Sequence, residues 1–253
     1  GIPGSTLLAG LAVPLVIVDV GWRAAFGFAI AVPVIVGALV PRRPGAATSS
    51  AVAAIDERRS VRPMPVRLLV RLGVGTALAT WAAIALSSYL VAAAVDAGFT
   101  EEQGGVLLFV GSAASIAARV GIGIVTDRIG GRGFGGVALL AAVGSLVFAG
   151  LVVAKGPWFV LLVPLAYATG WGWPGLMTFT VVNANVGSPA SSSAITQAGV
   201  FVGAGLSPIA LGWIVDTWSF EVAFAAVAGM LVASSLTVVS VGRAAREVRS
   251  AEG

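Results

Sequence analysis

The sequence predicts an all-α polytopic membrane protein, and three observations support this fold class. Hydrophobic residues make up 58% of the 253 residues, charged residues only 10%, and the mean hydropathy is +1.00, whereas a soluble domain is about a quarter charged. Residues 156–215 contain no charged residue, although about 20 apolar residues suffice to cross a bilayer. The apolar runs lack the alternation of barrel strands, so we expect each of them to be helical.

Charge-poor runs bounded by charged residues, Gly or Pro predict eight membrane-spanning helices. The long uncharged stretch must hold two of them, because one helix of that length would exceed the thickness of any bilayer. A polar turn over 183–190, which contains a Gly and a Pro, supplies the break. The predicted spans are 4–20, 24–41, 68–95, 103–126, 134–154, 157–182, 191–215 and 220–242.

The basic residues test this segmentation, because with eight spans every second connection lies on the same side. Twelve Arg residues fall in one set of connections, and only Arg23 and Lys155 fall in the other. By the positive-inside rule, the Arg-rich connections and both visible ends are cytoplasmic. The Arg-rich set comprises Arg42, Arg43, Arg58, Arg59, Arg62, Arg67, Arg71, Arg128, Arg132, Arg243, Arg246 and Arg249.

An internal repeat suggests that the spans belong to two related halves. The segment Ala9–Pro14 (AGLAVP) is similar to Ala204–Pro208 (AGLSP), and a period of six spans gives parallel repeats about an axis along the membrane normal. Two such repeats make twelve helices, so we expect four helices before Gly1, and a chain that starts with Gly-Ile-Pro is expected to be a fragment. The predicted parts are the last two helices of the N-terminal half (1–41), a flexible cytoplasmic linker (42–66), the six-helix C-terminal half (67–242) and a cytoplasmic tail (243–253).

The composition also excludes several classes of function. The chain has no Cys and no His, which removes disulfides, thiol nucleophiles, most zinc sites and a Ser-His-Asp triad. We therefore expect neither an enzyme nor a bound cofactor or metal. The net charge of +4 comes from Arg residues scattered between apolar runs rather than from one surface patch, so nucleic acid is not an expected partner. Fourteen Arg against one Lys indicates a GC-rich bacterial genome, and hence a bacterial plasma membrane.

Two motifs resemble the major facilitator superfamily of transporters. The segment GIVTDRIGGR over 123–132 resembles the family's cytoplasmic loop signature, except that Gly133 stands where a second basic residue is usual. The segment GWRAAF over 21–26 resembles the family's opening of helix six. The resemblance implies a twelve-helix permease of which helices five to twelve are present, and which moves a small solute by alternating access.

The loop signature implies a gate on the cytoplasmic side. Gly123 is expected to let two helices approach closely, and Gly130 to permit a tight turn with positive φ. Asp127 lies at a helix end, where its carboxylate can face the positive N-terminus of a neighbouring helix. The alternative is that Asp127 and Arg128 form a surface pair that only fixes topology. The expected gating residues are Gly123, Asp127, Arg128, Gly130 and Arg132.

Arg119 is the most informative candidate for substrate binding. It lies nine positions before Arg128 and therefore about 13 Å deeper along the same helix. A charge that faces lipid there costs about 2.5–3.5 kcal/mol or more. Either Arg119 lines the transport cavity and attracts an anionic group, or it extends to the lipid headgroups or pairs with an acid on a preceding helix.

The other cavity candidates are aromatic or polar residues of the spans. Trp171 and Trp173 lie beside Pro174, which predicts a kink that exposes backbone to a substrate, although both rings are equally expected as packing residues. Gln197 can hydrogen-bond a substrate, while the nearby Gly199, Gly203 and Gly205 indicate close helix packing. The full set of candidates is Arg119, Trp81, Tyr89, Trp171, Trp173 and Gln197.

The leading hypothesis is therefore a monomeric transporter whose partners are a small-molecule substrate and membrane lipid. The coupling ion stays open, a proton or another ion, because no Asp, Glu or His lies near mid-membrane in the predicted spans. The alternative is a membrane component that does not transport, such as a sensor, a scaffold or a channel subunit. A channel would be expected to show a repeated filter-like segment, and the sequence has none.

Overall fold

The computed structural model describes residues 37–38, 63–128 and 133–250. The elements of these ranges are six α-helices, each long and apolar enough to cross a membrane. This confirms the all-α class and the last six predicted spans. Six spanning helices are described rather than the expected eight, because the predicted spans 4–20 and 24–41 lie outside the described residues except for 37–38. The helices are α5 (Val66–Asp96), α6 (Glu101–Arg128), α7 (Gly133–Val153), α8 (Pro157–Ala184), α9 (Pro189–Thr217) and α10 (Phe220–Ser250).

One predicted boundary is wrong. We expected the last helix to end at residue 242 and a tail to follow, but α10 continues to Ser250. Charged residues mark the end of an apolar span, yet Ala, Arg and Glu are strong helix formers and do not end a helix. The predicted break over 183–190 is confirmed, since α8 ends at Ala184 and α9 begins at Pro189.

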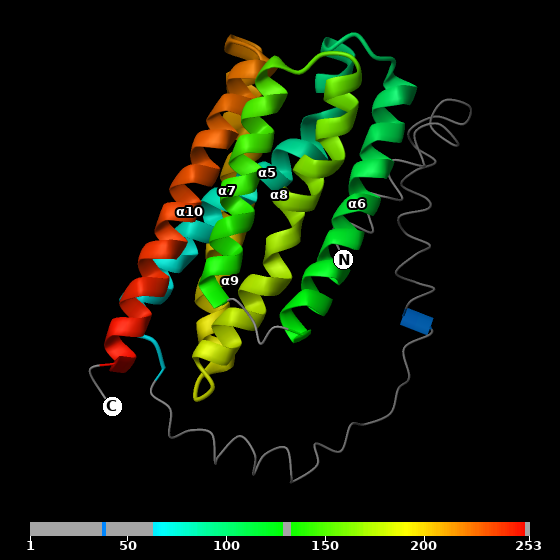
Figure 1. The fold of residues 1–253 in the computed structure, drawn as a ribbon. Helices are drawn as coiled ribbons and strands as arrows, with labels where there is room; N and C mark the ends of the chain where they lie inside the picture. The colour runs from blue at the N-terminus through cyan, green and yellow to red at the C-terminus, as the bar shows by residue number, and fades with distance from the viewer. Residues whose placement is uncertain (1–36, 39–62, 129–132, 251–253) are drawn as a thin grey trace.

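Consecutive helices run in opposite directions and pack into one bundle (Figure 1). The most extensive contacts join α10 to α7, α5 to α9, and α6 to α8, and α5 also contacts α6, α8 and α10. Two helices are much less buried than the rest. In their most apolar windows only 22% of α6 and 17% of α9 is buried, against 39–56% for the other four. These two helices therefore keep most of their surface for lipid or for parts of the protein that lie outside this bundle.

Glycines bring α9 against α5. A Cβ atom on Gly199 would overlap the carbonyl of Gly73, and one on Gly203 would overlap the carbonyl of Ala77. The contact leaves room for the Thr76 hydroxyl to donate to the carbonyl oxygen of Thr196 at 2.9 Å. The predicted close packing is thus confirmed for Gly199 and Gly203. For Gly205 it stays a prediction, because a Cβ there would meet nothing within 4 Å among the described residues.

A buried tyrosine joins three helices on the other side of α5. Tyr167 of α8 is fully buried, and its ring occupies the space that a side chain at Gly111 of α6 would need. Its hydroxyl donates to the carbonyl oxygen of Leu86 of α5 at 3.1 Å. The α5, α6 and α8 helices are therefore fixed to one another near the centre of the bundle.

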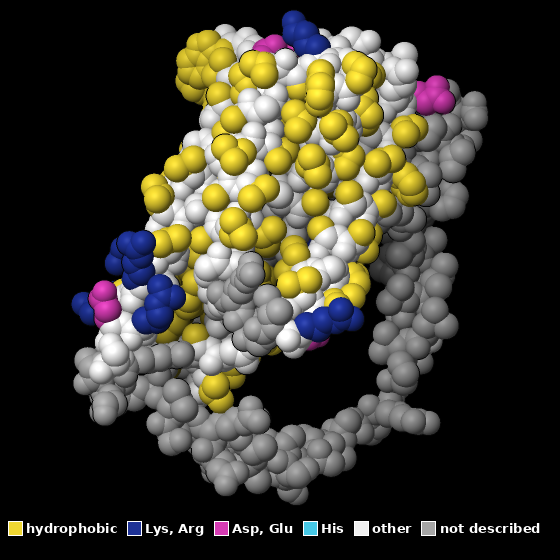
Figure 2. Space-filling view, viewed as in Figure 1, with side chains coloured by type: hydrophobic (Ala, Val, Ile, Leu, Met, Phe, Trp, Pro, Cys, Tyr) yellow, Lys and Arg dark blue, Asp and Glu magenta, His cyan; other side chains and the backbone are white. Residues whose placement is uncertain are grey.

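Most Arg side chains lie at one end of the bundle and most acidic side chains at the other (Figure 2). One end holds the start of α5 and the ends of α6 and α10, and we call it the basic end; we call the opposite end the acidic end. Exposed indoles also gather at the acidic end, on Trp158, Trp213 and Trp218, which is typical of the membrane–water interface. The basic end carries Arg67, Arg71, Arg128, Arg243 and Arg246 together with Asp127 and Glu247, and the acidic end carries Asp96, Glu101, Glu102, Lys155, Asp216 and Glu221.

A buried amide ties the turn between α8 and α9 to the segment that enters α5. Asn185 has 0% exposure, its Oδ1 accepts a hydrogen bond from the backbone N–H of Met64 at 2.7 Å, and its Nδ2 donates to the carbonyl oxygen of Val181 at 2.8 Å. Both ends of this amide are therefore satisfied away from water.

Asn185→Leu is expected to lower stability by about 1–3 kcal/mol, because the buried N–H of Met64 loses its acceptor. The thermal midpoint in detergent measures this loss. Asn183→Leu is the matched control, since Asn183 is exposed in the last turn of α8 and its side chain makes no hydrogen bond with a described residue. Equal midpoints for the two variants would contradict the prediction.

Candidate functional site

Arg119 is the one charged residue in the middle half of any described helix. Its Nε donates a hydrogen bond to the carbonyl oxygen of Trp171 at 2.6 Å, and its Cζ lies 5.6 Å from the centroid of the Trp171 ring. The guanidinium is therefore held against α8 by a charge-assisted hydrogen bond and by a cation–π contact. The side chain stays on the bundle and does not extend to the basic end.

The sequence of α8 weakens the helix beside this contact. Pro164 and Pro174 lie inside the helix, and Pro174 cannot supply the N–H that would bond the carbonyl of Gly170. This loosens the hydrogen-bond ladder of the turn that contains Trp171. Gly172 brings α6 close at the same level, because a Cβ atom there would lie 3.1 Å from Cδ1 of Ile122.

The arrangement leaves two of the three guanidinium nitrogens without a described partner. Arg119 is partly buried, and its terminal Nη1 and Nη2 groups make no hydrogen bond or ion pair with any residue in the described part of the chain. These two nitrogens form a planar fork whose spacing matches a carboxylate, phosphate or sulfonate group. The site can therefore hold one anionic group in a fixed orientation at this depth.

Trp171 and Trp173 are placed as packing residues. They are 6% and 3% exposed, and neither indole N–H has a hydrogen-bond partner among the described residues. Trp171 supports Arg119 through its ring and its carbonyl. Because both rings are buried, the geometry favours the packing interpretation for them over stacking on a substrate.

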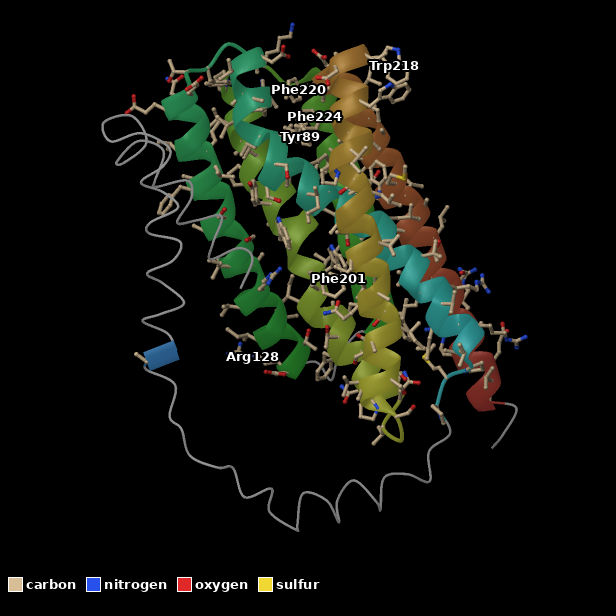
Figure 3. The ribbon with its side chains drawn as sticks, turned by 180° about the vertical axis from the view of Figure 1, so that it is seen from behind. Tyr89, Arg128, Phe201, Trp218, Phe220 and Phe224 are labelled. Carbon is tan, nitrogen blue, oxygen red and sulfur yellow. The ribbon has the colours of Figure 1, made fainter. Side chains whose placement is uncertain are left out.

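The remaining cavity candidates do not form one cluster. Gln197 is exposed on α9, eight positions after Pro189, and both it and Arg119 lie about 12–13 Å from the basic end. Tyr89 lies seven positions before the end of α5 and so about 10 Å from the acidic end. Its hydroxyl donates to the carbonyl oxygen of Pro208 at 2.6 Å, which ties α5 to α9 (Figure 3). Trp81 packs against the core.

The described part of the gating motif lies at the C-terminal end of α6. Asp127 and Arg128 are exposed and make no hydrogen bond or ion pair with a described residue, and Figure 3 labels Arg128 at this end. Among the described residues, a Cβ at Gly123 would meet nothing within 4 Å, so the close approach expected there stays a prediction. Gly133 has a φ of +53°, which favours glycine and explains why no basic residue stands there. Gly130 and Arg132 lie outside the described residues.

Two structural residues of this region escaped prediction from the sequence. Tyr167 and Gly111 form the contact that fixes α6 on α8, and Arg119 lies two turns further along α6. The sequence feature that could have indicated this contact is a lone Tyr in one uncharged span and a Gly in the middle of a neighbouring span.

Within the described residues, no group of three or more Asp, Glu, His or Cys side chains could hold a metal ion. No protein-family model, curated protein or solved structure matches this chain.

Proposed function

We propose that this chain is the C-terminal portion of a secondary transporter of the major facilitator type, and that it moves a small solute with an anionic group across a bacterial plasma membrane. The observation that carries the proposal is the Arg119 side chain, a lone cation deep in a spanning helix with its Nη1 and Nη2 groups free of described partners. A charge at that depth is costly and usually marks a transport pathway. An anion on the Nη fork would offset that cost.

The proposed architecture assigns α5 to α10 to the C-terminal half and residues 1–41 to the last two helices of the N-terminal half. The sparse burial of α6 and α9 supports the view that these helices face the central cavity and the opposite half. The basic end is cytoplasmic in this proposal, by the positive-inside rule. The exposed Asp127 and Arg128 would then meet the other half when the cytoplasmic side closes.

The proposed cycle uses α8 as the support of the binding site. The hydrogen bond from Nε to Trp171 fixes the orientation of the guanidinium, so an incoming anion finds the fork already in place and less side-chain entropy is lost on binding. The prolines of α8 leave its hydrogen-bond ladder easier to bend than that of an unbroken helix. Rocking of the two halves would then carry Arg119 and its anion from access at one side of the membrane to access at the other.

Reconstitution of the full-length protein in liposomes tests this proposal. Radiolabelled acetate, succinate and phosphate serve as anionic probes, and glucose and glycerol serve as neutral probes, each under an inward proton or sodium gradient. We expect saturable uptake of at least one anion above that of protein-free liposomes, and no such uptake of the neutral solutes. Saturable uptake of a neutral probe alone, or of none of the five, would count against an anion transporter.

A further inference from the structure

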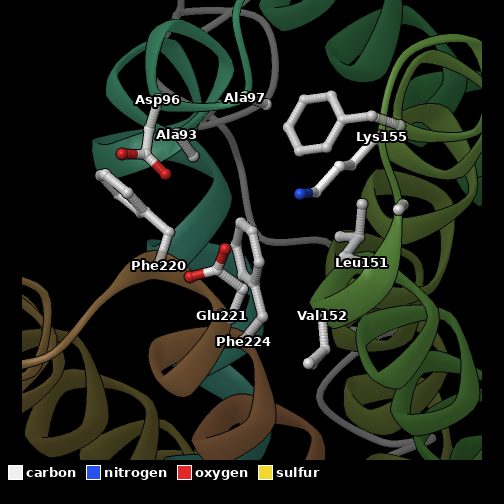
Figure 4. Close-up of a pocket in the computed structure, with 11 residues that line it drawn as sticks. Ala93, Asp96, Ala97, Leu151, Val152, Lys155, Phe220, Glu221 and Phe224 are labelled. Carbon is white, nitrogen blue, oxygen red and sulfur yellow. The ribbon is translucent and has the colours of Figure 1, made fainter.

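A cavity lies at the acidic end of the bundle, far from Arg119. It has a volume of about 150 Å³, well above the roughly 10–15 Å³ that one water molecule needs. The ends of α5 and α7, the start of α8 and the start of α10 surround it (Figure 4). Its lining includes three charged residues, Asp96, Lys155 and Glu221, and three aromatic ones, Phe159, Phe220 and Phe224.

The charges around this cavity are of both signs and do not pair with one another. No N···O separation of 4.0 Å or less joins Lys155 to Asp96 or to Glu221. Figure 4 shows the Lys155 ammonium on one side of the space and the two carboxylates on the other. Both signs of charge are therefore available to a molecule between them.

The aromatic walls are fixed by contacts among rings. Phe159 stacks on Phe99 with centroids 5.7 Å apart, and Phe224 makes an edge contact with Phe148 at 6.1 Å. Phe220 lies 6.5 Å from Phe224. Such ring faces attract the carbon atoms next to an ammonium group as well as the ammonium itself.

These features define the chemistry of a ligand. The lining charges sum to −1, from one Lys against two acids, so a simple anion is repelled by two carboxylates and a simple cation meets Lys155. A net-neutral zwitterion avoids both conflicts, with its ammonium toward Asp96 and Glu221 and its anionic group toward Lys155. We propose that this cavity binds a small zwitterion that carries a primary ammonium and a single anionic group.

The same chemistry has two natural sources. The cavity lies at the level of the exposed indoles that mark the membrane–water interface, where the headgroup of an ethanolamine phospholipid resides. It also faces the aqueous phase at the ends of the helices, where a free amino acid would arrive. Soluble glycerophosphoethanolamine therefore represents the headgroup, and β-alanine represents the free zwitterion.

Thermal unfolding of the full-length protein in detergent, followed by the fluorescence of its Trp residues, tests the proposal. Ligand binding to the folded state should raise the midpoint by about 2–4 °C at saturation with at least one of the two probes. Lys155→Gln and Glu221→Gln should each weaken the apparent affinity at least tenfold. Both side chains are exposed, so the unliganded variants should melt like the parent protein. Glu102→Gln is the matched control, since Glu102 is an exposed acid at the same end and does not line the cavity.

The outcomes separate the sources and decide the proposal. A shift with glycerophosphoethanolamine alone supports the site and assigns it to a lipid headgroup, while a shift with β-alanine supports the site and assigns it to a free zwitterion. No saturable shift with either probe would overturn the proposal, as would an equal shift in both Gln variants. None of these results depends on transport, so the site at Arg119 is judged separately.

Discussion

Gly199→Val is expected to prevent α9 from packing on α5. A Cβ atom at this position would overlap the carbonyl group of Gly73 and approach the Thr76 hydroxyl, and backbone atoms cannot move aside as a flexible side chain can. Extra atoms in a packed interior typically cost about 1–3 kcal/mol, occasionally more, and we expect this contact to lie at or above the top of that range. The thermal midpoint in detergent and the fraction of monodisperse protein after size exclusion measure the effect.

Gly205→Val is the matched control for this substitution. It places the same side chain six positions further along α9, where the Cβ would meet nothing within 4 Å among the described residues. The free energy of unfolding of the control should stay within about 0.5 kcal/mol of that of the parent protein, as is usual for surface substitutions. A thermal midpoint of Gly199→Val equal to that of the parent protein would contradict the close contact between Gly199 and the Gly73 carbonyl.

Arg119→Gln is expected to lower the apparent affinity for a transported anion about 100-fold. Because the Gln amide can still donate one hydrogen bond, we count the loss of one charge-assisted bond of the Nη fork, about 1.5–3 kcal/mol, and every 1.4 kcal/mol corresponds to about a factor of ten. Arg119→Lys should lose about tenfold, because an ammonium keeps the charge but cannot bind bidentately. The concentration dependence of initial uptake in proteoliposomes measures both variants.

Two controls separate binding from folding in this experiment. Arg246→Gln removes an exposed arginine at the basic end of α10 and should leave uptake unchanged. The thermal midpoint of Arg119→Gln should stay near that of the parent protein, because the substitution removes a costly partly buried charge along with its bond to Trp171. An unchanged affinity in a well-folded Arg119→Gln protein would remove this residue from the site.

The helices were predictable because charge and hydrophobicity alone report the membrane boundary. The predicted spans start and end within two residues of α5 to α9, since charged or turn-forming residues stand at nearly every boundary. The end of α10 was not predictable in this way. Arg243 ends the apolar run but not the helix, because a helix that leaves the bilayer can continue in water when its residues have good propensity.

The contacts of the site depended on the rotation of each helix, which the sequence does not report. Gly199 and Gly203 are four positions apart and share a face, whereas Gly205 lies about 200° around the helix from Gly203. All three matched the same small-residue pattern. Arg119 was identified from its depth alone, but its bond to the Trp171 carbonyl depends on how α6 faces α8. The cavity at the acidic end is lined by residues from four helices, so no short sequence motif could predict it.

The length of α10 has a practical consequence. Its 31 residues extend about 46 Å at 1.5 Å per residue, and a bilayer offers a hydrocarbon core about 30 Å thick. The last turns of α10, with Arg243 and Arg246, therefore extend beyond the acyl chains as a continuous helix. A fluorescent protein or an affinity tag inserted after Ser250 would be held off the lipid surface, where antibodies and resins can reach it without disturbing the spans.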